Sequence, residues 1–250
     1  MINQLINKQL ICERFRKSLN TYNSHATAQT IINNKLIQLI PPSFEPKKIF
    51  EIGCGTGILS GLLEAKFSSS EFIFNDLVFE SKGCFNNFKA NHSFAMGDIE
   101  TIDFPSNNNL IISGSALQWL TDLPMFAIKA SNALTENGLL IYNTYGANNF
   151  TEISSITGSG IQYPSVEQIK NSIEDKFEIL LLESENITLY FNSPLEVLKH
   201  MKNTGTNAIS REKWTPSDFN NFEKEYRKLF HSNKGFSLTY NPIYIVAKKK

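Results

Sequence analysis

Hydrophobic and polar residues follow two different periods along the chain, and their alternation predicts a sheet covered by helices. Short apolar runs rich in β-branched and aromatic residues begin at residues 48, 71, 92, 110 and 138 and have the composition of buried parallel strands. Between the first two runs, residues 58–66 place apolar side chains at helical spacing. This alternation, from about residue 48 to residue 144, indicates an α/β fold with a mostly parallel sheet and helices on both faces.

The flanking segments are predicted mainly from helix signals. Residues 10–40 form a helical arm with apolar spacing over 31–40, and Pro41 and Pro42 end it. Beyond the core, the pattern predicts helices over 166–174, 194–203 and 215–230, strands over 177–182 and 187–191, and a final strand over 236–247. We expect a single domain made of an arm (1–44), a ligand-binding core (45–147), a lid or substrate-recognition insertion (148–215), and a C-terminal helix and strand (216–250).

Composition excludes several classes of protein. The chain has 250 residues, enough for one sizeable domain, and no apolar run of 18 or more residues that would predict a transmembrane helix. Its first residues lack the hydrophobic stretch of a signal peptide. Three cysteines, an odd number without metal-ligand spacing, indicate a reducing compartment and no metal site. We expect a cytoplasmic protein that does not act at a membrane.

Charge is balanced overall but unevenly distributed. Residues 1–48 carry seven basic and two acidic side chains (net +5), residues 49–210 eight and eighteen (net −10), and residues 211–250 nine and four (net +5). The basic ends are either a docking surface for an acidic partner or solvated helices with a lysine tail. The acidic centre disfavours nucleic acid as a partner.

The stretch EIGCGTG, residues 51–57, carries the most specific chemical signal. Because it lies between a predicted strand and a predicted helix, its glycines let the backbone turn sharply beside a ligand, and the helix N-terminus presents free N–H groups. A dinucleotide site has G-x-G-x-x-G, but here Ile58 stands at the third glycine position. The pattern resembles motif I of the class I S-adenosylmethionine-dependent methyltransferases, which implies a Rossmann-like fold with a seven-stranded sheet.

Three later stretches agree with that resemblance. Asp76 ends the second apolar run 76 − 57 = 19 residues after the last motif glycine, about the separation at which an acid reaches a ribose diol. Asp98 follows the third run in a Gly-Asp turn; in the methyltransferases such an Asp accepts from the adenine amino group, and the next apolar residue, here Ile99, packs on the ring. The fourth run continues into a polar and aromatic loop that ends at Trp119.

The resemblance thus implies S-adenosylmethionine as the cofactor, and the core as its binding region. The residues expected to contact it are Glu51, Gly53, Cys54, Gly55, Gly57, Asp76, Leu77, Asp98, Ile99, Ser113 and Gln118. Within this set Cys54 is expected to be a small apolar filler of the glycine turn and not a nucleophile.

Longer stretches resemble one family within this class. They are residues 15–29, 115–120, 193–208 with the following Trp214, and 238–248. These stretches, which extend over most of residues 12–249, resemble the malonyl-acyl-carrier-protein O-methyltransferases of biotin synthesis. The chain departs from the common form at Ser115 and in the asparagine-rich loop 143–160. The resemblance implies methylation of the free carboxylate of malonyl-acyl-carrier protein, or of malonyl-coenzyme A, to give the ester that primes pimeloyl synthesis.

A carboxylate acceptor needs no general base, because an acid with a pKa of about 4 is already ionised at pH 7. Alignment and removal of water would then supply most of the catalysis. The candidates for the acceptor pocket are Tyr22, as a hydrogen-bond donor, and Trp119, as an apolar wall; simple packing is the alternative for each. Gln118 is expected to contact the cofactor or orient the acceptor, and His25 to be structural.

An acidic carrier protein requires a basic docking face. Two groups of basic residues are candidates for lining the entrance of the acceptor site. They are Lys199, Lys202, Arg211 and Lys213, which flank one discriminating stretch, and Arg14, Arg16 and Lys17 on the arm.

Three other functions stay open. The first is a methyltransferase that acts on another small-molecule carboxylate or amine. The second, a nucleic-acid methyltransferase, is disfavoured because no Asn/Asp-Pro-Pro-Tyr/Phe motif follows the fourth run. The third is a catalytically silent cofactor-binding protein, against which the acids at positions 51, 76 and 98 count.

Overall fold

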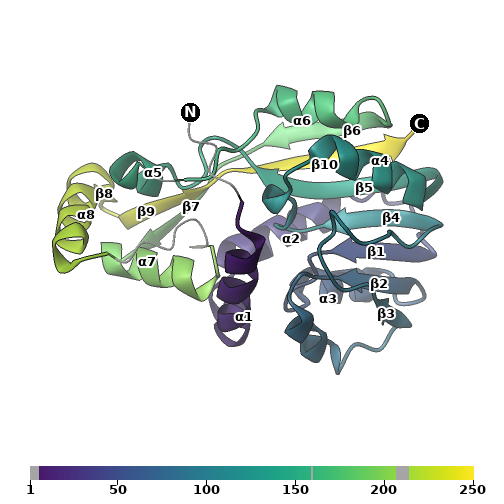
Figure 1. The fold of residues 1–250 in the computed structure, drawn as a ribbon, viewed down its shortest axis with the longest axis horizontal. Coiled ribbons are helices and arrows are strands. Elements are labelled where there is room, and N and C mark those ends of the chain that lie inside the picture. The colour runs from purple at the N-terminus through teal and green to yellow at the C-terminus, as the bar shows by residue number, and fades with distance from the viewer. Residues whose placement is uncertain (1–5, 159, 207–213) are drawn as a thin grey trace.

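A seven-stranded sheet forms the centre of the computed structural model, which describes residues 6–158, 160–206 and 214–250 (Figure 1). Its strand order is β3-β2-β1-β4-β5-β10-β6; β10 pairs antiparallel with both β5 and β6, and the other strand pairs are parallel. In the middle of the sheet Phe50 pairs with Ile73 on one side and with Ile111 on the other. The predicted mostly parallel, seven-stranded sheet is therefore confirmed.

Ten strands and ten helical segments are defined over the described residues. The strands are β1 (Lys48–Ile52), β2 (Glu71–Asn75), β3 (His92–Phe94), β4 (Asn108–Ser113), β5 (Leu134–Tyr145), β6 (Phe177–Ser184), β7 (Ile187–Phe191), β8 (His231–Ser232), β9 (Gly235–Tyr240) and β10 (Pro242–Lys249). The helices are α1 (Lys8–His25), α2 (Thr27–Leu39), α3 (Ile58–Lys66), α4 (Leu123–Ala133), α5 (Thr151–Thr157), α6 (Val166–Ile173), α7 (Pro194–Asn203) and α8 (Pro216–Leu229), with 3-10 turns η1 (Phe79–Phe85) and η2 (Leu117–Trp119).

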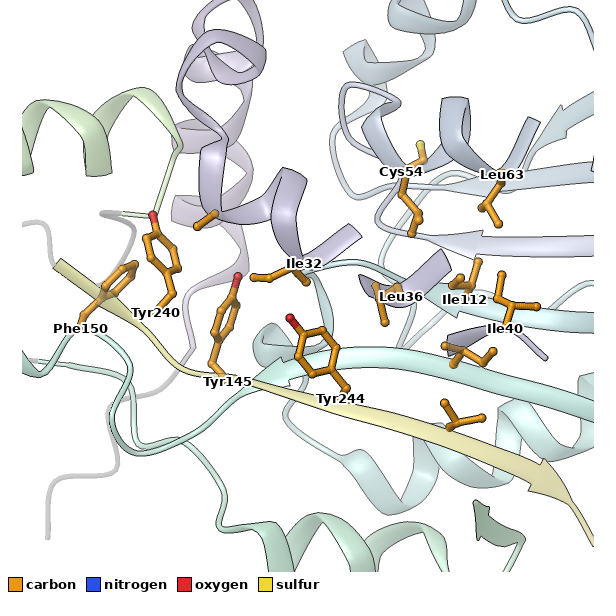
Figure 2. Packing of buried hydrophobic residues seen from close by; sticks show 14 of the residues in the cluster. Ile32, Leu36, Ile40, Cys54, Leu63, Ile112, Tyr145, Phe150, Tyr240 and Tyr244 are labelled. Carbon is orange, nitrogen blue, oxygen red and sulfur yellow. The ribbon is translucent and has the colours of Figure 1, made fainter. Parts of the chain in front are cut away.

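Helices cover both faces of the sheet, as predicted. On one face α2 and α3 contribute buried side chains such as Leu36 and Leu63 to a core that also contains Ile112 (Figure 2). On the other face Phe126 of α4 and Ile169 of α6 pack in a second core. No described helix contains a stretch of 18 residues apolar enough to cross a membrane.

The predicted final strand over 236–247 is wrong, because the chain forms two strands there that belong to different sheets. β9 joins β7 and β8 in a small three-stranded sheet, whereas β10 lies in the main sheet. Asn241 separates them: its side-chain amide donates to the Glu185 carbonyl at 2.9 Å, and its backbone N–H donates to Asn149 at 3.1 Å. Burial alternates along β9 but is nearly continuous along β10, so the two strands have different environments.

The predicted insertion 148–215 does not form one structural unit. Its described part supplies β6 to the edge of the main sheet and α6 to one face, while β7 and α7 belong to the smaller sheet and its helices. The arm consists of two helices that meet at Ala26, whose backbone N–H still bonds to Tyr22. Helix α1 contacts both α7 and η1. Figure 1 shows it between α7, beside the small sheet, and α3 of the core.

Candidate active site

One large pocket opens at the carboxyl ends of β1, β2 and β4, where ligands bind in open α/β sheets. Its empty volume is about 1350 Å³, which includes space open to solvent. Helix α1 forms one wall through Ile11, Phe15 and Tyr22. The pocket therefore extends from the glycine turn to the arm.

The glycine turn after β1 packs closely against neighbouring side chains. Gly53 and Gly55 have φ values of +70° and +53°, in the region that glycine adopts without strain. A Cβ atom at position 53 would lie 2.3 Å from the Cβ of Ala116, and one at position 55 would lie 3.1 Å from the ring of Phe15. Gly57, the N-cap of α3 with φ +85°, lies outside the pocket lining, so its predicted contact with the cofactor is not part of this site.

Three buried oxygen atoms in the pocket have no hydrogen-bond partner among the described residues. They belong to Glu51 (Oε2), Gln29 (Oε1) and Asn33 (Oδ1), which are 1%, 2% and 6% exposed. Burial raises the pKa of Glu51 from 4.5 to about 8. Unpaired buried acceptors destabilise a protein unless a donor reaches them. A ligand ammonium group, with three N–H donors and a positive charge, matches this set.

Asp76 is held at the next position along the sheet edge. One carboxylate oxygen accepts the N–H of Gly55 at 2.8 Å, and the other accepts the N–H of Val78 at 2.7 Å. Burial raises its pKa to about 6, against the effect of these bonds. Leu77 beside it lines the pocket, and the remaining lone pairs of the carboxylate can accept from a diol.

Asp98 lies in the lining with Ile99 and forms an ion pair with Lys8 of the arm at 2.6 Å. Lys8 also pairs with Glu100. Of the described residues that line the pocket, Lys8 alone carries a positive charge, and both its partners are carboxylates. This ion pair holds α1 over the end of the pocket at which the adenine of the cofactor is predicted to bind.

The loop after β4 separates two halves of the pocket. Gln118 donates to the carbonyl of Ser115 at 2.8 Å, its Oε1 has no partner within the described chain, and Trp119 lies in the lining. Ser113 instead donates to the Ile52 carbonyl at 2.9 Å and lies outside the lining, so the structure does not bring it into the site. Cys54 lines the pocket; burial raises the pKa of its thiol well above the ordinary value, which agrees with a filler and not a nucleophile.

Aromatic hydroxyl groups line the other half of the pocket. Tyr22 lies there with Tyr145, Tyr163 and Tyr240. Tyr145 and Tyr240 have ring centroids 6.3 Å apart, and Figure 2 shows their hydroxyls pointing in the same direction, away from the strands. Tyr240 bonds to the buried His200 at 2.7 Å. This half is uncharged over its described residues.

Several lining residues were missed from the sequence. Gln29 lies within a stretch quoted for the family resemblance, so it carried a signal. The sequence carried no signal for four other lining residues, because their positions depend on how the arm and the small sheet pack against the core. These residues are Lys8, Asn33, Tyr145 and Tyr240.

The predicted docking residues lie outside the pocket. Lys199 and Lys202 are exposed on α7, which packs beside α1, and Arg211 and Lys213 lie outside the described residues. On the arm, Arg16 and Lys17 are exposed and Arg14 is partly buried. His25 bonds to the Thr21 carbonyl at 2.8 Å and to Asn203 at 3.1 Å, which fits a structural role.

Comparisons with known sequences agree on a methyltransferase. The methyltransferase domain family matches residues 50–142. A malonyl-[acyl-carrier protein] O-methyltransferase of Bacteroides thetaiotaomicron is 39% identical over 260 residues, which cover 98% of this chain and 99% of that protein. One of Bacteroides fragilis is 40% identical over 248 residues, covering 97% of this chain; there the chain spans 51% of the relative's length.

Solved structures share the fold at low identity. The YcgJ protein from Bacillus subtilis has a TM-score of 0.62 at 14% identity, covering 87% of this chain and 97% of that one. The N-methyltransferase NodS from Bradyrhizobium japonicum, in complex with S-adenosyl-L-homocysteine, has a TM-score of 0.52 at 12% identity, covering 87% and 85%. The predicted class I, Rossmann-like methyltransferase fold is confirmed.

Proposed function

The chain belongs to the malonyl-[acyl-carrier protein] O-methyltransferase family, and on that premise we propose that it methylates the free carboxylate of malonyl-acyl-carrier protein with S-adenosylmethionine. The product would be the methyl ester that primes pimeloyl synthesis for biotin. The observation that carries the proposal is one continuous pocket with an acidic half at the glycine turn and an uncharged, tyrosine-lined half beside it.

The acidic half supplies complementary groups for each part of the cofactor. Glu51, with Gln29 and Asn33, would accept from the ammonium group, because their buried oxygens otherwise have no donor. Asp76 would accept from the ribose hydroxyls, and Asp98 from the adenine amino group. When bound, S-adenosylmethionine supplies an electrophilic methyl group on a positively charged sulfur.

The other half would bind and align the acceptor. The malonyl carboxylate is ionised at pH 7, so the protein need not remove a proton, and no histidine occurs among the described residues of the pocket lining. Tyr22 lines this half, and its hydroxyl makes no hydrogen bond within the described chain, so it is available to donate to a carboxylate. Trp119 would exclude water as an apolar wall. Catalysis then comes from orientation and desolvation of a weak nucleophile.

Docking of the carrier protein would use the basic residues around α7 and α1. Charge complementarity with an acidic partner chiefly raises the association rate. We expect the double charge reversal Lys199→Glu and Lys202→Glu to raise the KM for malonyl-acyl-carrier protein and to leave the KM for malonyl-coenzyme A nearly unchanged. An unchanged carrier-protein KM would remove these lysines from the docking surface. Arg211 is a further candidate outside the described residues.

The function is tested by transfer of labelled methyl groups to malonyl-acyl-carrier protein, with malonyl-coenzyme A and free malonate run in parallel. Asp76→Ala should abolish transfer, whereas Asp103→Ala, at an exposed aspartate outside the pocket lining, should not. Cofactor binding without transfer to either thioester would rule out a malonyl thioester as the acceptor and favour another small-molecule carboxylate. Absence of cofactor binding would favour a catalytically silent protein.

A further inference from the structure

Ser115 is held in an unusual backbone conformation at the boundary between the two halves of the pocket. Its φ of 56° places a non-glycine residue in the left-handed region, which costs of the order of 1 kcal/mol and persists only where the surroundings enforce it. Three bonds do so: its N–H donates to Asn143 at 2.8 Å, its carbonyl accepts from Gln118 at 2.8 Å, and its Oγ accepts from Tyr145 at 2.9 Å.

The position of Ser115 follows from the strand order. It comes two residues after β4, which lies between β1, the strand that leads into the glycine turn, and β5, the strand that ends at Tyr145. The next residue, Ala116, is packed against Gly53 of that turn. The Ser115 hydroxyl therefore lies where the cofactor half and the tyrosine half of the pocket meet.

The direction of the Tyr145 bond leaves the serine proton free. The Tyr145 hydroxyl donates its proton to Ser115 Oγ at 2.9 Å. The amide of Asn143 approaches the same Oγ at 3.5 Å, again as a donor. With these donors on one side of Oγ, and no acceptor for its own proton within the described chain, the Ser115 O–H is an oriented donor into the pocket.

We infer that Ser115, oriented by Tyr145, donates a hydrogen bond to the acceptor carboxylate, at the oxygen that does not take the methyl group. This inference rests on the proposed function and deepens it. The described part of the acceptor half offers only neutral donors, and an anionic oxygen accepts from such a donor more strongly than an ester oxygen does. Ser115 is thereby a specificity residue for a carboxylate over its methyl ester, and Tyr145 is its positioning residue.

Two ligands that differ by one methyl group, and therefore in the charge of the acceptor, test this directly. We would measure the affinities of malonyl-acyl-carrier protein and of its methyl ester for the protein saturated with S-adenosylhomocysteine, and define the ratio of the two as the acid preference. Loss of one hydrogen bond to a charged group should reduce this preference about 10- to 100-fold in Ser115→Ala. Ser115→Gly, which also removes the left-handed strain, should lose as much. S-adenosylhomocysteine affinity should stay within about twofold.

Three further variants distinguish the loss of the hydroxyl donor from a general loss of binding. Tyr145→Phe should lose part of the preference, and Ser115→Ala with Tyr145→Phe should lose no more than Ser115→Ala, because the tyrosine acts through the serine. Tyr142→Phe, on the same strand but outside the pocket, should keep the wild-type preference. A Ser115→Ala protein that binds both ligands equally weakly, with an unchanged ratio, would overturn the inference and leave the function intact. A wild type that transfers no methyl group to any malonyl thioester would overturn both.

Discussion

If Glu51 accepts from the cofactor's ammonium group, as proposed, cofactor binding should depend on pH through a proton that the ligand must displace. Burial raises the pKa of this carboxyl from 4.5 to about 8, so the ligand-free protein carries a neutral Glu51 at pH 7. An ammonium group of the cofactor would favour the ionised form. Binding below pH 8 should therefore release a proton, and Glu51→Gln should remove that release.

The magnitude follows from the ionised fraction. With a pKa of about 8, Glu51 is about one hundredth ionised at pH 6, one tenth at pH 7 and one half at pH 8. If the ligand binds the ionised form, its affinity rises about 50-fold between pH 6 and pH 8. At pH 7 the ionisation costs about 1.4 kcal/mol of binding free energy.

The assay is calorimetric titration with two ligands. S-adenosylhomocysteine has the ammonium group, whereas 5′-methylthioadenosine has the same nucleoside without the amino-acid end. Because Asp76, with a pKa of about 6, would face the ribose of both ligands in the proposed site, its titration should cancel in the ratio of their affinities. The ratio should rise with pH in the wild type and stay flat in Glu51→Gln.

The stability of the unliganded protein gives a second readout, which should change with pH in the opposite direction to the ligand affinity. The folded pKa of Glu51 lies above its unfolded value of 4.5, so the native state binds more protons between pH 4.5 and about pH 8, and stability falls as pH rises through that window. Glu51→Gln should therefore raise the Tm most at pH 8 while it weakens S-adenosylhomocysteine binding. A ligand ratio that is equally flat in the wild type and the variant would refute the reasoning.

Three further predictions concern the glycine turn, the arm and the small sheet. Gly53→Ala should unfold about 1–3 kcal/mol more easily and lose S-adenosylhomocysteine binding, because its Cβ would lie 2.3 Å from Ala116, whereas Gly61→Ala, with nothing within 4 Å, should lose neither in parallel titrations. Lys8→Met should cost at most about 1 kcal/mol, since the ion pair is partly exposed, but should make limited proteolysis of the arm faster and less dependent on salt. Burial lowers the pKa of His200 from 6.5 to about 4, so its stabilising effect is present above pH 6.5 and lost toward pH 4; His200→Gln should flatten the Tm profile over that range, and an unchanged profile would contradict this.

The cofactor half of the site was predictable because it is local in sequence. Strand 48–52, the glycine turn and helix 58–66 follow one another, and the acids at 76 and 98 end the next two strands at the same sheet edge. The direction of the Ser113 hydroxyl was not predictable, because a side chain at a strand end points toward one of two sides; here the hydroxyl bonds to Ile52 of the neighbouring strand, outside the pocket lining. The residue type alone does not determine that choice.

The acceptor half depends on contacts between distant segments. Tyr240 joins it because the chain leaves the small sheet and enters the main sheet at Asn241, and a run of apolar residues from 236 to 247 gives little sign of that change. In the cofactor half, Asn33 lies beside Gly114 only because α2 packs against β5 and β10 of the sheet: a Cβ on that glycine would lie 2.3 Å from Asn33 Oδ1. Sequence spacing predicts neither contact.

The division of charge in the pocket also bears on turnover. The described cofactor half contains three carboxylates, and its one cation, Lys8, is already paired, whereas the acceptor half is neutral. A carboxylate entering the acceptor half would therefore find its nearest unpaired positive charge on the cofactor sulfur.

Methyl transfer converts the sulfonium to a thioether and the carboxylate to an ester, so the attraction between the two ligands disappears in the reaction itself. A site with an arginine for the carboxylate would keep a buried cation facing a neutral ester, an arrangement that costs desolvation energy without a partner. Neutral donors such as Ser115 and Tyr22 avoid that cost and let substrate charge govern both binding and release.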